Sequence, residues 1–283
     1  MKNVCLGEIK MNEKMICDFI NHLMDEEKSR NTIEKYSRDL SAFYKFLNNR
    51  ELDKTAVREY KEYLMDAYAP RSVNSMLAAL NSFFDYIERP DLKVKQLRIQ
   101  KQIFEAENKD LKKQDYKKLI EASKNDMRMQ LIIETLCATG MRVSELKFVT
   151  VENYQSGQCE VYNKGKQRIV FLPKKLIKKI RIYVRRKQIK KGKIFVTKNG
   201  KSIDRTTIWR GMKRLCKKAK VDAGKVFPHN LRHLFAKTYY SLKRDISKLA
   251  DILGHSSIDT TRIYVREDRK KHLRDLEGMD LVI

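Results

Sequence analysis

The sequence predicts a mainly α-helical protein with a small β-sheet, in which an N-terminal helical bundle precedes an α+β domain. Three observations support this prediction. Apolar residues recur at helical spacing through the first 90 residues, a charged and weakly patterned stretch follows, and the remaining helical patterns are interrupted by a single hairpin-like segment. At 283 residues the chain has room for two domains, each with its own core.

The N-terminal part is predicted to form four amphipathic helices. Apolar residues repeat every three or four positions in residues 15–24, 33–47, 57–64 and 73–87, which places them on one face of each helix. Pro90 ends the pattern, and the charged stretch after it is typical of an inter-domain linker. The predicted domains are therefore residues 10–90 and 111–283, joined by a linker over residues 91–110.

The second part mixes helices with a hairpin. Helical patterns cover residues 115–123 and 127–137, and Gly140 is a suitable C-cap before a short helix at 143–148. Residues 159–162 and 168–172 are predicted strands, joined through a bend at 163–167 that contains Gly165. Further helices are predicted at 206–219, 231–242, 246–253 and 258–265.

The net charge of +26 is concentrated in one stretch of the chain. Residues 1–100 hold 17 Lys and Arg against 16 Asp and Glu, whereas residues 161–220 hold 23 basic residues against a single acid, Asp204. Apolar residues such as Phe171, Ile194 and Trp209 are interleaved with these charges, which indicates a folded surface rather than a tail. Such a surface is typical of a polyanion-binding protein, and nucleic acid fits best. The alternative is a solvated, lysine-rich surface.

The composition argues against several other classes of protein. Hydrophobic residues make up 42% of the chain, and no apolar run approaches the roughly 18 residues of a membrane span, so no membrane partner is expected. The first 14 residues lack the apolar segment of a secretory signal, so a cytoplasmic location is expected. The five cysteines form no C-x-x-C pair and are odd in number, which argues against disulfides and structural zinc.

Four short motifs contain side chains suited to phosphate chemistry. An arginine follows a helix-ending glycine in A-T-G-M-R-V-S-E-L, and a lysine lies in the bend of the predicted hairpin in N-K-G-K. A histidine and an arginine stand three residues apart in P-H-N-L-R-H, so they share a helix face. A histidine follows a glycine in L-G-H, nine residues before a tyrosine in T-T-R-I-Y. The residues are Arg142, Lys164, His229, Arg232, His255 and Tyr264.

Each motif alone has an ordinary structural explanation. An arginine after a glycine is usually a surface residue or a partner of a nearby acid such as Glu145, and a helical tyrosine among apolar neighbours is normally in the core. Together, however, the residues suit a phosphodiester. Arginine forks match the nonbridging oxygens of a phosphate and stabilise transition-state charge without a metal. A phenol with a pKa of about 10 needs the base and the cations that histidine and arginine supply.

The set resembles the tyrosine recombinase (phage integrase) family, which includes the Xer recombinases, over almost the whole chain. Residues 31–47 also resemble the start of the family's core-binding domain, and residues 111–283 its catalytic domain. The family positions matched are the first arginine (Arg142), the hairpin lysine (Lys164, with Lys166 as a rival), H-x-x-R (His229 and Arg232), L-G-H (His255) and the nucleophile (Tyr264).

The resemblance implies a mechanism without metal, ATP or any other cofactor. Tyr264 would attack the scissile phosphate to give a 3′-phosphotyrosyl link, and Lys164 would protonate the departing 5′-oxygen. Arg142 and Arg232 would hold the nonbridging oxygens. His229 would act as base or hydrogen-bond donor, and His255 would donate to the phosphate. Glu145 would orient nearby groups.

The resemblance also implies partners. The two domains would form a C-shaped clamp on double-stranded DNA, and a homotetramer would act on two DNA sites, with room for an accessory DNA-bending or excision factor. The tail over residues 266–283 would dock on a neighbouring protomer. A mobile element and chromosome maintenance are both compatible with this activity.

Three alternatives remain at this stage. A type IB topoisomerase shares the chemistry, but the short spacing between His255 and Tyr264 leaves no room for a long helical insertion. A noncatalytic DNA-binding regulator would need only the basic stretch. A metal-dependent nuclease would need carboxylates or histidines at ligand spacing, which the motifs do not provide.

Overall fold

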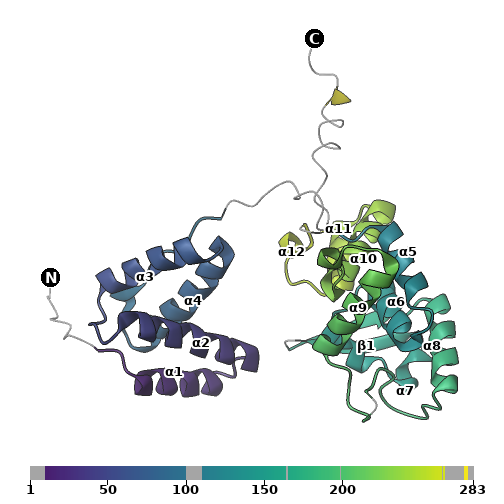
Figure 1. Ribbon diagram of the computed structural model, residues 1–283, viewed down its shortest axis with the longest axis horizontal. Helices are drawn as coiled ribbons and strands as arrows, with labels where there is room; N and C mark the ends of the chain where they lie inside the picture. Colours follow the sequence, from purple (N-terminus) through teal and green to yellow (C-terminus); the bar gives the residue numbers. More distant parts are fainter. Residues whose placement is uncertain are drawn as a thin grey trace. The chain divides into compact units, whose positions relative to one another are not determined.

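The computed structural model describes residues 10–99, 110–163, 165–197, 199–262, 264 and 277–279. The chain divides into two compact units, Met1–Lys101 and Gln102–Ile283 (Figure 1). Two sequence predictions fall wholly or mostly outside the described residues: the hairpin lysine Lys164, and the docking of the tail over residues 266–283. None of the described helices is long and apolar enough to cross a membrane.

The first unit is the predicted helical bundle. Three of its helices begin at a side-chain cap, because Asn12, Ser29 and Asp53 each accept a hydrogen bond from a backbone N–H three residues on. The fourth begins with Pro70, whose ring fixes a helical φ. The elements are α1 (Glu13–Asp25), α2 (Arg30–Leu47), α3 (Lys54–Ala67), α4 (Pro70–Tyr86) and the 3-10 helix η1 (Pro90–Leu92).

Aromatic side chains fill the core of this bundle. Phe19, Phe43, Tyr60 and Phe83 are each at most 1% exposed. The rings of Phe43 and Tyr60 lie 4.9 Å apart, and those of Phe19 and Phe83 meet edge-on at 5.5 Å, a favourable arrangement for aromatic pairs. All residues of this core fall between positions 11 and 97, so the bundle has a hydrophobic core of its own.

The second unit combines helices with one β-hairpin, and with the bundle it confirms the predicted fold class. Its first half contains α5 (Lys113–Ala122), α6 (Met127–Thr139), the 3-10 helix η2 (Val143–Phe148), α7 (Val151–Tyr154), β1 (Gln158–Asn163) and β2 (Lys166–Phe171). Its second half contains α8 (Lys174–Arg186), α9 (Arg205–Ala219), the 3-10 helix η3 (Ala223–Lys225), α10 (Pro228–Lys243), α11 (Ile246–Leu253) and α12 (Ile258–Arg262).

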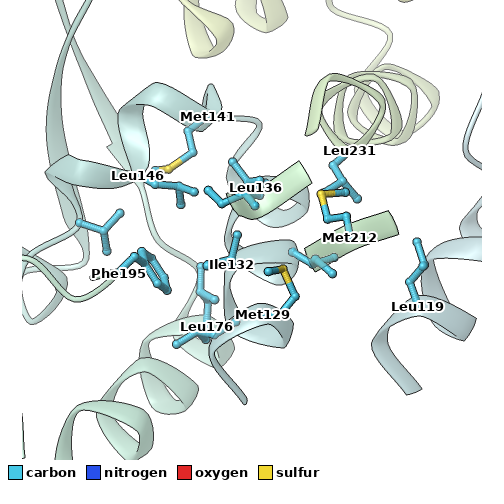
Figure 2. Close-up of a cluster of buried hydrophobic side chains, with 14 of the residues drawn as sticks. Leu119, Met129, Ile132, Leu136, Met141, Leu146, Leu176, Phe195, Met212 and Leu231 are labelled. Atoms are coloured by element: carbon cyan, nitrogen blue, oxygen red, sulfur yellow. The ribbon is translucent and has the colours of Figure 1, made fainter. Parts of the chain in front are cut away.

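Helix α6 is the centre of this unit. It packs against α5, α8, α9 and α10, which lie around it in Figure 1. Its residues Ile132, Ile133 and Leu136 are fully buried, as expected for a helix that is apolar all round. Figure 2 shows Ile132 and Leu136 within a cluster of leucine, methionine and phenylalanine side chains from the surrounding elements. This core fixes the ends of α6 and α10, where the motif residues lie.

The hairpin is longer than the sequence predicted. β1 and β2 pair antiparallel from Gln158↔Phe171 to Asn163↔Lys166, so the connection is two residues long rather than five. Its Gly165 has φ +72°, a conformation that glycine adopts without strain. The apolar residues Ile169 and Phe171 are 47% and 71% exposed, whereas the charged Arg168 faces inward on the same side of the strand as the buried Val170. The inward face of β2 therefore combines a charged and an apolar side chain, while two apolar side chains point outward.

The last predicted helix differs from the structure. Residues 258–265 were expected to be helical, with Tyr264 inside the helix, but α12 ends at Arg262. Tyr264 follows in a turn in which its backbone N–H donates to the carbonyl of Thr261. A helix of only five residues has few internal hydrogen bonds to extend it. The position just beyond its end lets the tyrosine side chain enter the unit.

Candidate active site

Arg142 is the N-cap of η2, three residues after α6 ends at Thr139. Gly140 ends that helix with φ +64°, and a Cβ there would collide with the ring of Phe235, so glycine is required. The Arg142 backbone N–H donates to Glu145 Oε2 at 2.8 Å, and its Nη1 donates to Glu145 Oε1 at 3.1 Å. The Arg142 side chain is 34% exposed, which leaves one edge of its guanidinium facing outward.

Arg232 lies in the first half of α10 and is only 3% exposed. Its Nη1 donates to the carbonyl of Gly140 at 2.7 Å, and its Nη2 donates to the carbonyl of Leu253 at 2.7 Å. These carbonyls lie at the C-terminal ends of α6 and α11, where the helix dipoles favour a positive charge. Burial, reinforced by nearby Arg142, lowers the pKa of Arg232 to about 10, so the guanidinium stays charged at neutral pH.

His255 connects Arg232 to α12. Its Nε2 lies 2.8 Å from Arg232 Nη2, and its Nδ1 lies 2.8 Å from Thr261 Oγ1. Because a guanidinium can only donate, Nε2 accepts and the ring proton is on Nδ1, which donates to Thr261. Burial, with Arg232 next in importance, lowers the pKa of His255 to about 4, so the ring is neutral at physiological pH. In this arrangement His255 holds Arg232 rather than offering a proton to a phosphate.

Tyr264 is surrounded by histidine rings. It is 4% exposed, and its ring lies 5.5 Å from His255 in a stacked arrangement and 6.0 Å from His229. His233 meets it edge-on at 4.4 Å. Arg232 interacts electrostatically with the Tyr264 side chain, which puts a buried positive charge next to the phenol. The tyrosine therefore lies among neutral bases and a cation, the surroundings that activate a phenol.

The remaining two histidines also favour the neutral form. Partial loss of hydration lowers the pKa of His229, and the positive charges of Arg232, Arg205 and Arg142 act in the same direction. Burial lowers the pKa of His233 to about 4, with His229 contributing. At neutral pH both rings are therefore uncharged, the form from which a general base acts, and the pKa of about 4 makes His233 a weak base.

A buried ion network lies beside these residues. Glu145 is 1% exposed and accepts hydrogen bonds from Arg142 and from Arg168, whose Nη2 lies 2.6 Å from Glu145 Oε2. The second nitrogen of Arg168, Nη1, donates to the carbonyl of Ile252 at 2.9 Å. Arg142, Arg168 and His255 line one cavity of about 600 Å³. The cavity lies between η2, the hairpin and the end of α11.

The structure brings five of the six predicted site residues into one region of the second unit. Arg232 contacts His255 and Tyr264, His229 is a neighbour of Tyr264, and Arg142 Nη2 reaches the carbonyl of Gly254 at 3.5 Å. Lys164 lies outside the described residues. The rival Lys166 begins β2. Among the described residues, no cluster of three or more His, Cys, Asp or Glu side chains could hold a metal ion.

Three residues of the site were not predicted from the sequence. Arg168 lies in a strand within the basic stretch, where a charged residue is expected to be exposed. His233 was part of a motif but was given no role. Thr261, fully buried beside His255, follows another threonine, and only the position of α12 distinguishes the two. The H-x-x-R-H sequence was the one available signal, because it puts His233 one helical turn from His229.

Both units match known protein families. The family described as "Phage integrase family" matches residues 109–271, and the one described as "Phage integrase, N-terminal SAM-like domain" matches residues 16–90. "Tyrosine recombinase XerA" of Pyrococcus furiosus is 34% identical, covering 95% of each chain. "Tyrosine recombinase XerD" of Vibrio cholerae is 30% identical, covering 87% of this chain and 90% of the relative.

The fold is also found in solved structures. A lambda integrase tetramer bound to a Holliday junction matches with a TM-score of 0.72 at 18% identity, over 93% of this chain and 79% of the integrase chain.

Proposed function

The chain belongs to the phage integrase family of tyrosine recombinases, which makes it a site-specific DNA recombinase, and from that premise we propose that Tyr264 is its nucleophile. Tyr264 attacks the scissile phosphate, the 5′-oxygen leaves, and a 3′-phosphotyrosyl link forms. The reverse attack by a 5′-hydroxyl rejoins the strand. Because the covalent link conserves the energy of the phosphodiester bond, the cycle needs no ATP.

One observation carries this proposal: Tyr264 is buried among His229, His255 and the charged Arg232, all from the second unit. A buried core tyrosine needs none of these neighbours. A nucleophilic phenol needs a base and a cation to favour the phenolate. His229, in the first turn of α10 and neutral at physiological pH, is the proposed base.

The two motif arginines stabilise the phosphate in different ways. Arg142, with an exposed edge beside the cavity, contacts a nonbridging oxygen directly. Arg232 contributes a fixed positive charge next to Tyr264, held by His255 and two helix ends. Together they supply the charge stabilisation that a metal would otherwise provide. Lys164 protonates the departing 5′-oxygen.

The substrate and assembly follow from the same premise. The structural relative named above is a tetramer on a Holliday junction, and we propose that four copies of this chain likewise act on two double-stranded DNA sites. We propose a cytoplasmic site of action, where DNA and reduced cysteines coexist, and an accessory DNA-bending or excision factor. Relaxation by a type IB topoisomerase and noncatalytic regulation are not favoured, because the relatives over nearly the whole chain are recombinases.

The test is Tyr264→Phe, which removes one oxygen and keeps the ring and its packing. DNA affinity should stay within about threefold, whereas the covalent adduct should disappear, because phenylalanine has no nucleophile. A suicide substrate nicked near the scissile phosphate is incubated in EDTA and resolved on a denaturing gel. An adduct formed by the parent protein in EDTA also supports metal-independent cleavage.

Tyr239→Phe and Tyr240→Phe are the matched controls. Both tyrosines lie on α10 and pack against the cluster that contains Tyr264, so their loss perturbs the same region. Each control should retain the adduct. An adduct formed by Tyr264→Phe, or lost in either control but not in Tyr264→Phe, would show that another residue is the nucleophile.

A further inference from the structure

Arg168 is an inward-facing arginine on a strand whose neighbouring residues point outward. Its side chain is 13% exposed, and both of its terminal nitrogens are bonded within the protein, Nη2 to Glu145 and Nη1 to the carbonyl of Ile252. Its Nε is buried without a hydrogen-bond partner among the described residues. Burying a guanidinium costs free energy unless it is paired, and here burial lowers the pKa of Arg168. Such an arrangement in a small unit calls for a functional reason.

The partner of Arg168 is also the partner of Arg142. Glu145 presents Oε2 to Arg168 Nη2 and to the Arg142 backbone N–H, and Oε1 to Arg142 Nη1. One buried carboxylate therefore serves two arginines from separate elements, β2 and η2. The network keeps a net charge of +1, and it lies against the cavity that also contains His255.

Arg168 and Arg142 differ in how fully their side chains are bonded within the protein. Both terminal nitrogens of Arg168 are bonded within the protein at 2.9 Å or less, whereas Arg142 lines the cavity, is 34% exposed, and its Nη2 has a long bond of 3.5 Å to the carbonyl of Gly254. Gly254 provides the space for this division, because a Cβ there would lie 2.7 Å from Arg168 Nε and closer still to its Cδ. The backbone thus approaches Arg168 where only glycine fits.

We propose that Arg168 is a positioning residue for Arg142 and acts through Glu145. The proposal rests on the function proposed above, and it adds a residue of the site that touches no substrate. By holding Glu145 from β2, Arg168 fixes the carboxylate and takes part of its negative charge. Arg142 then keeps both its orientation and enough positive charge to contact a nonbridging phosphate oxygen.

Loss of Arg168 should harm the chemistry more than DNA binding. Without it, the buried Glu145 has Arg142 as its remaining cationic partner and draws the guanidinium away from the cavity. In Arg168→Ala, single-turnover cleavage at saturating DNA should fall about tenfold or more, since a misplaced donor loses much of its effect on the transition state. The DNA dissociation constant should change by less than about threefold. Arg168→Lys, which keeps one bond to Glu145, should recover part of the rate.

A double-mutant cycle separates positioning from a general structural role. Cleavage rates are measured for the parent, Arg168→Ala, Arg142→Ala and the double variant on the suicide substrate. If Arg168 acts through Arg142, its replacement should cost less than about threefold once Arg142 is already alanine. A second substrate carries a methylphosphonate at the scissile position, which removes one negative oxygen. The parent-to-variant rate ratio should shrink on this substrate for Arg168→Ala as it does for Arg142→Ala.

The control is Lys124→Ala, which removes one positive charge from an exposed ion pair with Glu121 outside the basic stretch. It should keep the parent rate on both substrates. Thermal unfolding identifies variants that fail to fold, and if Arg168→Ala fails, the cycle is run with Arg168→Lys.

The proposal is overturned if replacing Arg168 costs as much without Arg142 as with it, or if the methylphosphonate leaves the ratio unchanged. If the parent forms no adduct at Tyr264, the proposed function fails and this inference fails with it. If the parent forms the adduct but the effects of replacing Arg168 and Arg142 are additive, the proposed function stands and only the positioning role of Arg168 is overturned.

Discussion

At the scale of single residues, the two motif arginines are held in opposite ways. Arg232 is 3% exposed and bonded to two backbone carbonyls and His255, whereas the Arg142 side chain is 34% exposed and bonded mainly to Glu145. Arg232 is therefore in place before DNA arrives. Arg142 has freedom to adjust to the phosphate, which makes it the residue whose position needs control.

The choice between the two hairpin lysines is a prediction about individual residues. Asn163 pairs with Lys166 in the strand ladder, so Lys166 belongs to β2, whereas Lys164 lies outside the described residues. We expect Lys164→Ala to slow cleavage far more than Lys166→Ala, about a hundredfold against a few-fold, because general acid catalysis contributes on the order of 10²–10⁴. The measurement is the single-turnover rate of the two variants on the suicide substrate.

The leaving group provides the control for this prediction. A 5′-bridging sulfur replaces the departing oxygen with a thiolate, which leaves without a proton because thiols are far more acidic than alcohols. The Lys164→Ala defect should largely disappear on this substrate. Equal defects in the two lysine variants, or a Lys164→Ala defect that sulfur does not relieve, would count against the assignment.

Individual site residues could be predicted where a motif sets them apart, but not where burial does. Arg142, His229, Arg232, His255 and Tyr264 stand in short motifs, and the structure brings them together. Arg168 is one of 23 basic residues in a stretch of 60, and local sequence gives no sign that it alone pairs with a buried acid. That pairing depends on the approach of η2 and α11 to the hairpin, which is a tertiary contact.

At the scale of elements, the end of α11 places a tight constraint on the site. Gly254 has φ +63° and lies against Arg168. We expect Gly254→Ala to destabilise the protein by about 1–3 kcal/mol, because the left-handed conformation and the collision act together. Cleavage should slow as well, since Arg168 must move. Thermal unfolding and single-turnover cleavage measure the two effects.

Gly192→Ala is the matched control for Gly254→Ala. Gly192 also has a positive φ, +77°, but a Cβ there would meet no atom within 4 Å. It carries the backbone strain without the collision, so its unfolding free energy should fall less and its cleavage rate should stay near that of the parent. Equal losses in the two variants would mean that the space beside Arg168 is unimportant.

Element boundaries followed the sequence where a cap or a proline marks them. The bundle helices begin at Asn12, Ser29, Asp53 and Pro70, which are residue types that favour helix starts. The predicted helix over 258–265 was too long, because Tyr264 lies in a turn and packs against residues of α10 and α11. The hairpin was placed correctly, but its inward face was not predicted, since Arg168 rather than Ile169 or Phe171 is buried.

At the scale of the whole molecule, the basic stretch is expected to govern the affinity for DNA. Residues 161–220 carry 23 basic residues and one acid, and they include the hairpin and helices α8 and α9. We expect the binding constant to fall steeply with salt, with a slope in log–log form of about −0.9 for each phosphate neutralised. With six or more contacts, affinity should drop about a thousandfold between 50 and 200 mM salt, measured by fluorescence anisotropy. A slope shallower than about −2 would remove this stretch from the DNA interface.

Arg232 has a consequence for how such proteins diverge over time. It joins the C-terminal ends of α6 and α11 to α10, so the folded unit depends on it whether or not a strand is ever cut. Selection for the fold alone is enough to retain it. The hydroxyl of Tyr264 and the exposed part of Arg142 have no comparable structural role, so a lineage that gives up recombination and keeps DNA binding would lose these first. Among descendants of such an enzyme, the buried arginine therefore records shared architecture, and the tyrosine records continuing activity.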